Sequence, residues 1–429
     1  MTRRRWLSAL SAVLALTWFA NPAEAEQAMP GGGSAQGIAA GKNIPQFGGP
    51  NAVGSTIIED ALNRSTTVPG TPRLTPLESW FAFKERLNDQ HGLTLGLDYS
   101  ALAQHYSGGA IDENDAVGGI GRFYGTWSLY GRENSNTGNI VFKVENRHRI
   151  TTELAPQDAG IAAGSTLPTG TAFSNINGAL TNLFFQHRLA DGNFTVLAGM
   201  ADVTDYLDVY GLISPWMHFQ NLAFLTSPAI AAPNQGLGIA AGGMLTSNIY
   251  AVAGLADANG DPTLSVNPFD SFFDTKEYFS HAEIGWTSGK ERIYLDNVHL
   301  TYWRVDEREA VGIDESEGLA ASAAWFINEK WLPFVRAGWS RGPAAAMKRT
   351  LAGGLGLRRE NKDVVGIGIA WGDPSIAELR EQKTGEIFYR WQMTDVLAIT
   401  PNVQIIWDPA LNSDENRIAI FGFRTRFSM

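Results

Sequence analysis

Hydrophobic and polar residues alternate over most of the chain after residue 92. GLTLGLDYS, residues 92–100, carries leucines and a tyrosine at odd positions and Asp98 at an even one. NIVFKVENRHRI, residues 139–150, sets apolar side chains opposite Lys143, Glu145, Arg147 and Arg149. Successive side chains of a strand point to opposite faces, so a period of two predicts strands with one apolar and one polar face.

The same alternation predicts sixteen strands. Beyond 93–100 and 139–150, the predicted segments are 120–131, 181–188, 193–200, 236–244, 248–256, 278–287, 297–303, 317–327, 331–339, 349–358, 363–372, 385–393, 401–407 and 418–429. Short turns such as LADGN and SGKER alternate with long links such as 151–178 and 201–234. Short turns at one end and long loops at the other are typical of outer-membrane barrels. Pro333 and Pro401 fall within predicted strands, where we expect bulges or strand ends.

The first 92 residues lack the alternating pattern of the rest of the chain. Residues 1–25 contain three arginines, an apolar run and Ala-Glu-Ala, the order of a secretory signal peptide. Residues 26–76 are rich in Gly, Pro, Ser and Thr, which predicts a flexible leader. LESWFAFKERLNDQHG, residues 77–92, has apolar residues at helical spacing and predicts a short N-terminal helix before the barrel, 93–429.

The last strand, IAIFGFRTRFSM, decides what covers the apolar face. Its odd positions carry three phenylalanines and its even positions carry Arg424 and Arg426. A soluble sandwich could bury the phenylalanines, but it would need a covering layer, and no helical layer is predicted. Lipid on the odd face keeps both arginines in water. The sequence therefore predicts an all-β fold, a transmembrane antiparallel β-barrel of about 16 strands.

Composition supports this class and excludes others. The chain has 429 residues, no cysteine and a net charge of −11, which disfavours nucleic-acid binding. No stretch after the signal peptide approaches the roughly 18 apolar residues of a transmembrane helix.

Polar residues on the predicted inner face are candidates for lining a pore. A pore that passes sugars needs hydrogen-bonding groups beside aromatic rings, and arginine supplies five donors. Each of these residues could instead only solvate the wall. The candidates are Asp98, Lys143, Glu145, Arg147, Arg149, Trp303, Arg390, Arg424 and Arg426.

The link 202–235 lacks alternation and is long for a structureless loop, which marks it as functional. It either folds into the barrel as a constriction or caps it from outside. Its candidate residues are Asp205, Tyr206, Asp208, Trp216 and His218.

The sequence contains few motifs for metal binding or catalysis. DANGDP, residues 257–262, resembles the start of a calcium loop but has Pro262 where glycine is required. We expect a turn, with calcium as the alternative and no other cofactor. A barrel hydrolase using His299 or His218 is a rival class without a supporting motif, so we expect no enzyme.

Several stretches together resemble the carbohydrate-selective porin family of the OprB type. They are ESWFAFKERLNDQHGLTLGLDYSALAQHYSGG, VENRHRI, LAGMADVTDYLD and GLADANGDP, followed by a C-terminal barrel strand. The resemblance covers residues 77–429, and it departs at Met429, where a terminal Phe or Trp is usual.

The resemblance implies a porin in the bacterial outer membrane for passive, carbohydrate-selective diffusion of sugars. A general or anion-selective pore is the alternative. The expected partners are sugars, outer-membrane lipid and lipopolysaccharide, and the barrel-assembly machinery.

Overall fold

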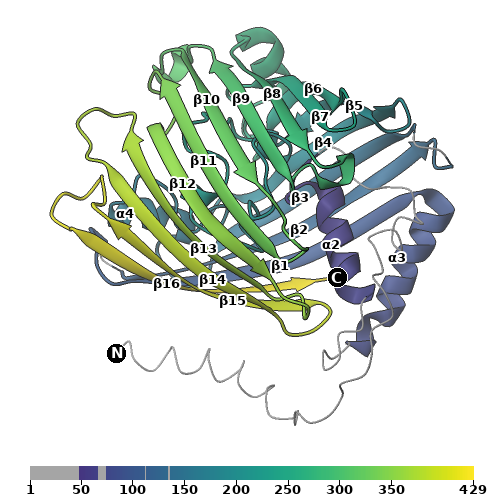
Figure 1. Ribbon diagram of the computed structural model, residues 1–429, viewed down its shortest axis with the longest axis horizontal. Coiled ribbons are helices and arrows are strands. Elements are labelled where there is room, and N and C mark those ends of the chain that lie inside the picture. Colours follow the sequence, from purple (N-terminus) through teal and green to yellow (C-terminus); the bar gives the residue numbers. More distant parts are fainter. Residues whose placement is uncertain (1–47, 66–73, 112, 134–135) are drawn as a thin grey trace.

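The computed structural model describes residues 48–65, 74–111, 113–133 and 136–429. Within these residues, sixteen antiparallel strands form one closed barrel, in which each strand pairs with its sequence neighbours and β1 pairs with β16 (Figure 1). The strands are β1 (Leu93–Tyr106), β2 (Asp115–Tyr130), β3 (Gly138–Arg149), β4 (Asn177–Leu189), β5 (Phe194–Ala201), β6 (Gly236–Met244), β7 (Ile249–Asp257), β8 (Tyr278–Thr287), β9 (Asn297–Val305), β10 (Ser316–Ala324), β11 (Trp331–Arg341), β12 (Met347–Arg358), β13 (Val364–Pro374), β14 (Gln382–Gln392), β15 (Leu397–Trp407) and β16 (Arg417–Ser428). The predicted fold class is confirmed.

The alternation along each strand separates an apolar outer face from a polar inner face. On β9, Val298 and Leu300 are 51% and 48% exposed, whereas Thr301, the residue after Leu300, is fully buried. On β16, Phe421 is 55% exposed and Arg424 is 0% exposed. The predicted faces of both strands are therefore confirmed, with the arginines inside the barrel.

The connections also follow the predicted alternation. Turns at one end are short, such as 190–193 between β4 and β5, and this end also holds the start of β1 and the end of β16. The other end holds the long links, including 150–176 with α4 (Pro156–Ala163) and 258–277 with the short α5 (Pro268–Asp270). We refer to these as the short-turn end and the long-loop end.

The two prolines behave differently. Pro333 is the third residue of β11 and so lies near a strand end, as predicted. Pro401 lies in the middle of β15 without a bulge, contrary to the prediction. The ladder between β14 and β15 is interrupted there, between the pairs Phe388–Asn402 and Trp391–Ile399, because proline has no N–H to donate. The register is the same on both sides of the gap.

A helix precedes the barrel where the sequence predicts one. It is α3 (Glu78–His91), and it ends at Gly92, whose φ of 70° is left-handed. A Cβ on Gly92 would lie 2.8 Å from the Ser128 carbonyl oxygen, so only glycine fits this turn into β1. The Trp127 indole donates to the His91 carbonyl at 3.1 Å and holds the end of α3 against β2.

A second helix, α2 (Val53–Ser65), lies within the segment predicted to be a flexible leader, 26–76. For these residues the prediction is wrong. Polar residues of α2, including Thr56, Asp60 and Asn63, are buried, because the helix lies in the lumen beside the inner faces of β1, β2 and β3 (Figure 1). Val53, Ile57 and Ala61 are spaced as in an amphipathic helix, a signal that the Gly-, Pro- and Ser-rich composition of the whole segment outweighed in the prediction. The predicted signal peptide, residues 1–25, lies outside the described residues.

Among the described helices, none is long and apolar enough to cross a membrane.

Candidate functional site

The loop 202–235 folds into the barrel. Nearly all of its residues from Asp202 to Ile230 are buried. The rings of Tyr210 and Phe219 pack against Phe334 of β11 and Phe388 of β14, with centroids 5.0–5.9 Å apart. Within the loop, Phe224 packs against Phe219 with centroids 4.7 Å apart. Of the two arrangements that the sequence left open, the structure shows the inward one. The loop therefore fills the lumen beside the β10–β14 wall.

Asp208 is the main polar anchor of this loop. Its carboxylate accepts a hydrogen bond from the Arg336 guanidinium of β11 and pairs with the His299 imidazole of β9 at 3.1 Å. The Ser227 N–H donates to the same carboxylate at 2.7 Å. Arg336 also donates to the carbonyls of Asp208 and Leu225. One buried ion pair thus ties two separate parts of the loop to the wall.

A second anchor lies on β14 and β15. Glu386 accepts the N–H groups of Gln220 and Asn221 at 2.9 and 3.0 Å. The Asn221 amide donates to the Gln404 side chain at 2.9 Å. These bonds fix the centre of the loop, because two adjacent backbone donors share one carboxylate.

On the opposite side, Trp216 meets the wall of β1, β2 and β16. The Arg122 guanidinium lies 4.0 Å from the centroid of the Trp216 ring, within the range of a cation–π contact. Arg424 donates to the Pro215 carbonyl. His218 is buried, with its ring 6.3 Å from that of Phe388.

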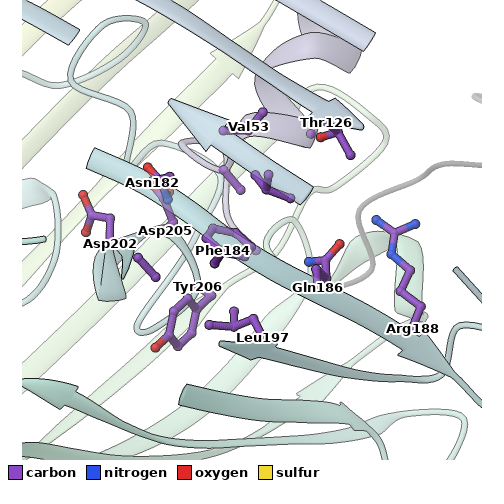
Figure 2. Close-up of a pocket in the computed structure, with 15 residues that line it drawn as sticks. Val53, Thr126, Asn182, Phe184, Gln186, Arg188, Leu197, Asp202, Asp205 and Tyr206 are labelled. Carbon is purple, nitrogen blue, oxygen red and sulfur yellow. The ribbon is translucent and has the colours of Figure 1, made fainter. Parts of the chain in front are cut away.

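A cavity of about 50 Å³ remains between the loop, the inner faces of β2–β5 and residues 48–54 before and within α2. Figure 2 shows Asp202, Asp205 and Asn182 at one end, Gln186 and Arg188 at the other, and Phe184 and Tyr206 between them. Hydrogen-bonding groups thus flank aromatic rings, the combination that suits a sugar. The volume holds a few water molecules and is too small for a sugar ring.

Lys143 and Asp205 meet at this cavity, although they are far apart in the sequence. The Lys143 Nζ lies 3.3 Å from the Asp205 carboxylate, and the Asn182 amide donates to the same oxygen at 3.1 Å. Burial raises the pKa of Asp205 to about 7, although Lys143 acts in the opposite direction. The loop thus carries a carboxyl that titrates near neutral pH at the edge of the cavity.

The other predicted residues of β3 lie further toward the long-loop end. Arg147 pairs with Glu145 at 2.5 Å. Arg149 is exposed at the rim and donates to the Glu153 carbonyl at 2.6 Å. Arg147 and Arg426 lie in one row of the sheet, through Ser100 and Ile120, three strands apart. At about 4.8 Å per strand this is a separation of roughly 14 Å, so the two arginines share a wall but no partner.

The remaining predicted residues all face inward. Asp98 accepts hydrogen bonds from both Arg122 and Arg426 and is 2% exposed. Arg390 is buried near the short-turn end of β14. Trp303 is fully buried against Phe279, with ring centroids 6.1 Å apart, so its ring is covered and does not line open space.

Several residues of the site were missed from the sequence. Arg122 and Arg336 lie on predicted strands, and alternation alone would have placed both on the inner face. Asn182, Gln186 and Arg188 also follow the alternation of β4. Glu59 and Asp60 of α2 gave no signal, because their helix was not predicted.

DANGDP forms a turn between β7 and β8, as expected. Asp257 accepts the Asn259 N–H at 2.9 Å, and Asp261 accepts the Thr263 N–H at 2.8 Å. In the part of the chain that the structure describes, no group of three or more His, Cys, Asp or Glu side chains is arranged to hold a metal. His299 is fully buried and holds the loop through Asp208, so it does not lie at the rim where the rival hydrolase would need it.

Comparison with solved structures supports the fold. A structure of Pseudomonas putida OprB at high pH aligns with a TM-score of 0.66 and 16% identity, covering 82% of this chain and 97% of its own. A mutant of the Rh. blastica porin aligns with a TM-score of 0.50 and 11% identity, covering 79% of this chain and 100% of its own. At these identities the likeness shows the fold alone. No curated protein matched the chain.

The sequence also matches a family model. Residues 129–429 match the model described as "Carbohydrate-selective porin, OprB family", which is more than half of the chain. Members of this family are channels of the outer membrane, not enzymes, and they admit carbohydrates by passive diffusion. By this match and by its closed barrel of sixteen strands, the chain belongs to the OprB family of carbohydrate-selective porins.

Proposed function

We propose that sugars cross the barrel along the inner faces of β3 and β4, beside the loop 202–235. The observation that carries this proposal is the lining of the cavity in Figure 2, with polar groups at both ends and Phe184 and Tyr206 between them. The cavity must widen before a sugar ring can pass. Glu145 and Arg147 continue the polar surface toward the long-loop end. The β10–β14 wall offers no comparable route, because the aromatic rings of the loop cover it.

The chemistry of this surface fits neutral sugars. Hydroxyl groups exchange water for amide, guanidinium and carboxylate partners, each at a net gain of about 0.5–1.5 kcal/mol. The faces of a sugar ring, which are made of C–H groups, can stack on Phe184 and Tyr206. Weak individual bonds are needed, because a sugar that binds tightly does not leave the pore.

The other predicted partners belong to the outside of the barrel. We propose that the exposed apolar band contacts the outer-membrane lipid and that the long-loop end faces lipopolysaccharide, with the short-turn end in the periplasm. Met429 pairs with Leu97 through two backbone hydrogen bonds of 2.7 and 3.1 Å. The barrel-assembly machinery would therefore meet a final strand that ends in an apolar residue.

The double variant Gln186→Leu with Arg188→Met tests the route. Both substitutions keep side-chain volume near the cavity and remove its hydrogen-bond donors. We expect glucose to block the ion current through single channels about tenfold less tightly, since two hydrogen bonds are lost, while the conductance without sugar stays the same or rises.

The matched control is Gln90→Leu with Arg86→Met, the same two changes on the exposed surface of α3. Glucose block should be unchanged in this control. If the cavity variant folds and binds glucose as tightly as the control, then Gln186 and Arg188 only solvate the wall. A current that responds to anions but never to sugars would favour the anion-selective alternative.

A further inference from the structure

The helix α2 lies across the lumen and touches the wall at several places. Val53 packs with Tyr124 of β2 and Val141 of β3. Near its C-terminal end, the Leu62 carbonyl accepts a hydrogen bond from Lys362, in the turn between β12 and β13. The preceding Gly49 N–H donates to the Asp205 carbonyl of the loop at 2.6 Å. The helix therefore closes the space that the loop 202–235 leaves at the short-turn end.

Two adjacent carboxylates of α2 enter a basic part of the wall. The Asp60 carboxylate accepts two hydrogen bonds from the Arg426 guanidinium, at 2.7 and 2.9 Å, in a bidentate arrangement. Glu59 lies 3.6 Å from the guanidinium of Arg390. Burial raises the pKa of Asp60, but Arg426 outweighs this effect and brings it below its ordinary value. Asp60 is therefore a carboxylate at neutral pH.

The wall alone does not neutralise this basic cluster, which we define as Arg358, Lys362, Arg390 and Arg426. Arg426 shares Asp98 with Arg122, so two guanidinium groups face one carboxylate of the wall. Arg390 donates to the neutral side chain of Gln392 at 3.0 Å, and among the described residues the carboxylates that act on it are Glu59 and Asp60, both of α2. Without α2, the cluster would carry excess positive charge inside a narrow barrel.

Planar guanidinium groups in a forked arrangement recognise carboxylates. We propose that the basic cluster is a binding site for sugars that carry a carboxylate, and that α2 closes the pore by placing Glu59 and Asp60 in that site. This proposal rests on the route for sugars proposed above, and it adds acidic sugars to the substrates. The helix acts as an internal stand-in for the ligand and must leave for the ligand to enter.

The chain that leads into α2 also borders the proposed route. The cavity beside the loop is bounded on one side by residues 48–54, so departure of this segment would widen the proposed route.

The first test uses the full chain with Glu59→Gln and Asp60→Asn. We expect the mean single-channel current to rise about tenfold, because the two charge-assisted contacts that hold the helix are lost. The matched control, Glu78→Gln with Asp89→Asn, makes the same chemical change on exposed positions of α3 and should conduct like the unchanged chain. Gluconate should then block the current of the open variant at about one tenth of the concentration at which glucose does.

A third variant adds Arg390→Met to the open pair. It should keep the raised current and lose the preference for gluconate over glucose. Gluconate and glucose blocking equally in the open pair would overturn the carboxylate site. If neither solute blocked any variant, the proposed sugar route itself would fail, which separates the two conclusions.

An engineered disulfide that holds the segment leading into α2 against the loop tests the plug in one folded protein, before and after reduction. A Cβ on Gly49 would lie 2.8 Å from the Val209 Cβ, near disulfide distance once the backbones part by about 1 Å. The chain has no cysteine of its own to interfere. With Gly49→Cys and Val209→Cys, we expect opening events to disappear on oxidation and to return on reduction. Equal currents in both redox states would overturn the role of α2 as a plug.

Discussion

Replacing Arg336 with methionine is expected to release the loop 202–235 from the barrel wall. Methionine keeps much of the volume but removes every hydrogen bond to Asp208 and Leu225. Asp208 then remains as a buried carboxylate whose remaining contacts are His299 and the Ser227 N–H, at a cost of about 3–5 kcal/mol for breaking one side of a buried pair. We expect the single-channel conductance to rise, because the loop no longer fills the lumen.

Proteolysis reports this release directly. The loop contains neither lysine nor arginine but holds Tyr206, Tyr210 and Trp216, so chymotrypsin is the suitable protease. The Arg336→Met barrel should be cut in the loop under conditions in which the unchanged chain is not. Adding Asp208→Asn, which removes the unpaired charge, should restore part of the protection. Identical digestion of Arg336→Met and the unchanged chain would show that this ion pair does not hold the loop.

Replacing Leu300 with arginine is expected to prevent stable insertion into a bilayer. Leu300 is 48% exposed and is the fourth residue of the nine in β9, so its side chain faces the middle of the lipid. An arginine there costs about 2–4 kcal/mol. The fraction that refolds in lipid vesicles at a given urea concentration, measured from the shift in gel mobility between folded and heated samples, should fall sharply.

Glu317→Arg provides the matched control. Glu317 lies near the long-loop end of β10, where the Tyr302 hydroxyl donates to it at 3.1 Å, so an arginine there reaches the interface at a cost of about 0–1 kcal/mol. The control should refold almost normally. Equal refolding of Leu300→Arg and Glu317→Arg would mean that Leu300 does not face lipid.

The sequence predicts the barrel well because alternation is a local signal. Each strand must show apolar side chains to the outside and polar ones to the inside, and this requirement repeats every two residues. The sixteen strands and the inward direction of Asp98, Lys143 and Arg424 therefore follow from the residues alone. Which inward residues meet is a matter of register, and the sequence contains no comparable signal for it.

Three features of the structure could not be predicted from local sequence patterns. Lys143 and Asp205 meet only because the loop turns inward, which depends on anchors such as Arg336 on a distant strand. Pro401 sits inside β15 because one missing donor interrupts the ladder without shifting its register. The helix α2 has Val53, Ile57 and Ala61 at helical spacing, but the composition of residues 26–76 favoured a leader, and the burial of Asp60 depends on contacts with distant strands.

We expect this barrel to admit carbohydrates in preference to other solutes. Swelling of proteoliposomes that contain the open variant with Glu59→Gln and Asp60→Asn tests it most directly, with glucose compared against valine, a smaller neutral solute. A hydrogen-bonding route predicts faster swelling in glucose than in valine, and slower swelling in glucose when Gln186→Leu and Arg188→Met are added. Swelling rates that simply follow solute size, with valine ahead of glucose in every variant, would contradict carbohydrate selectivity.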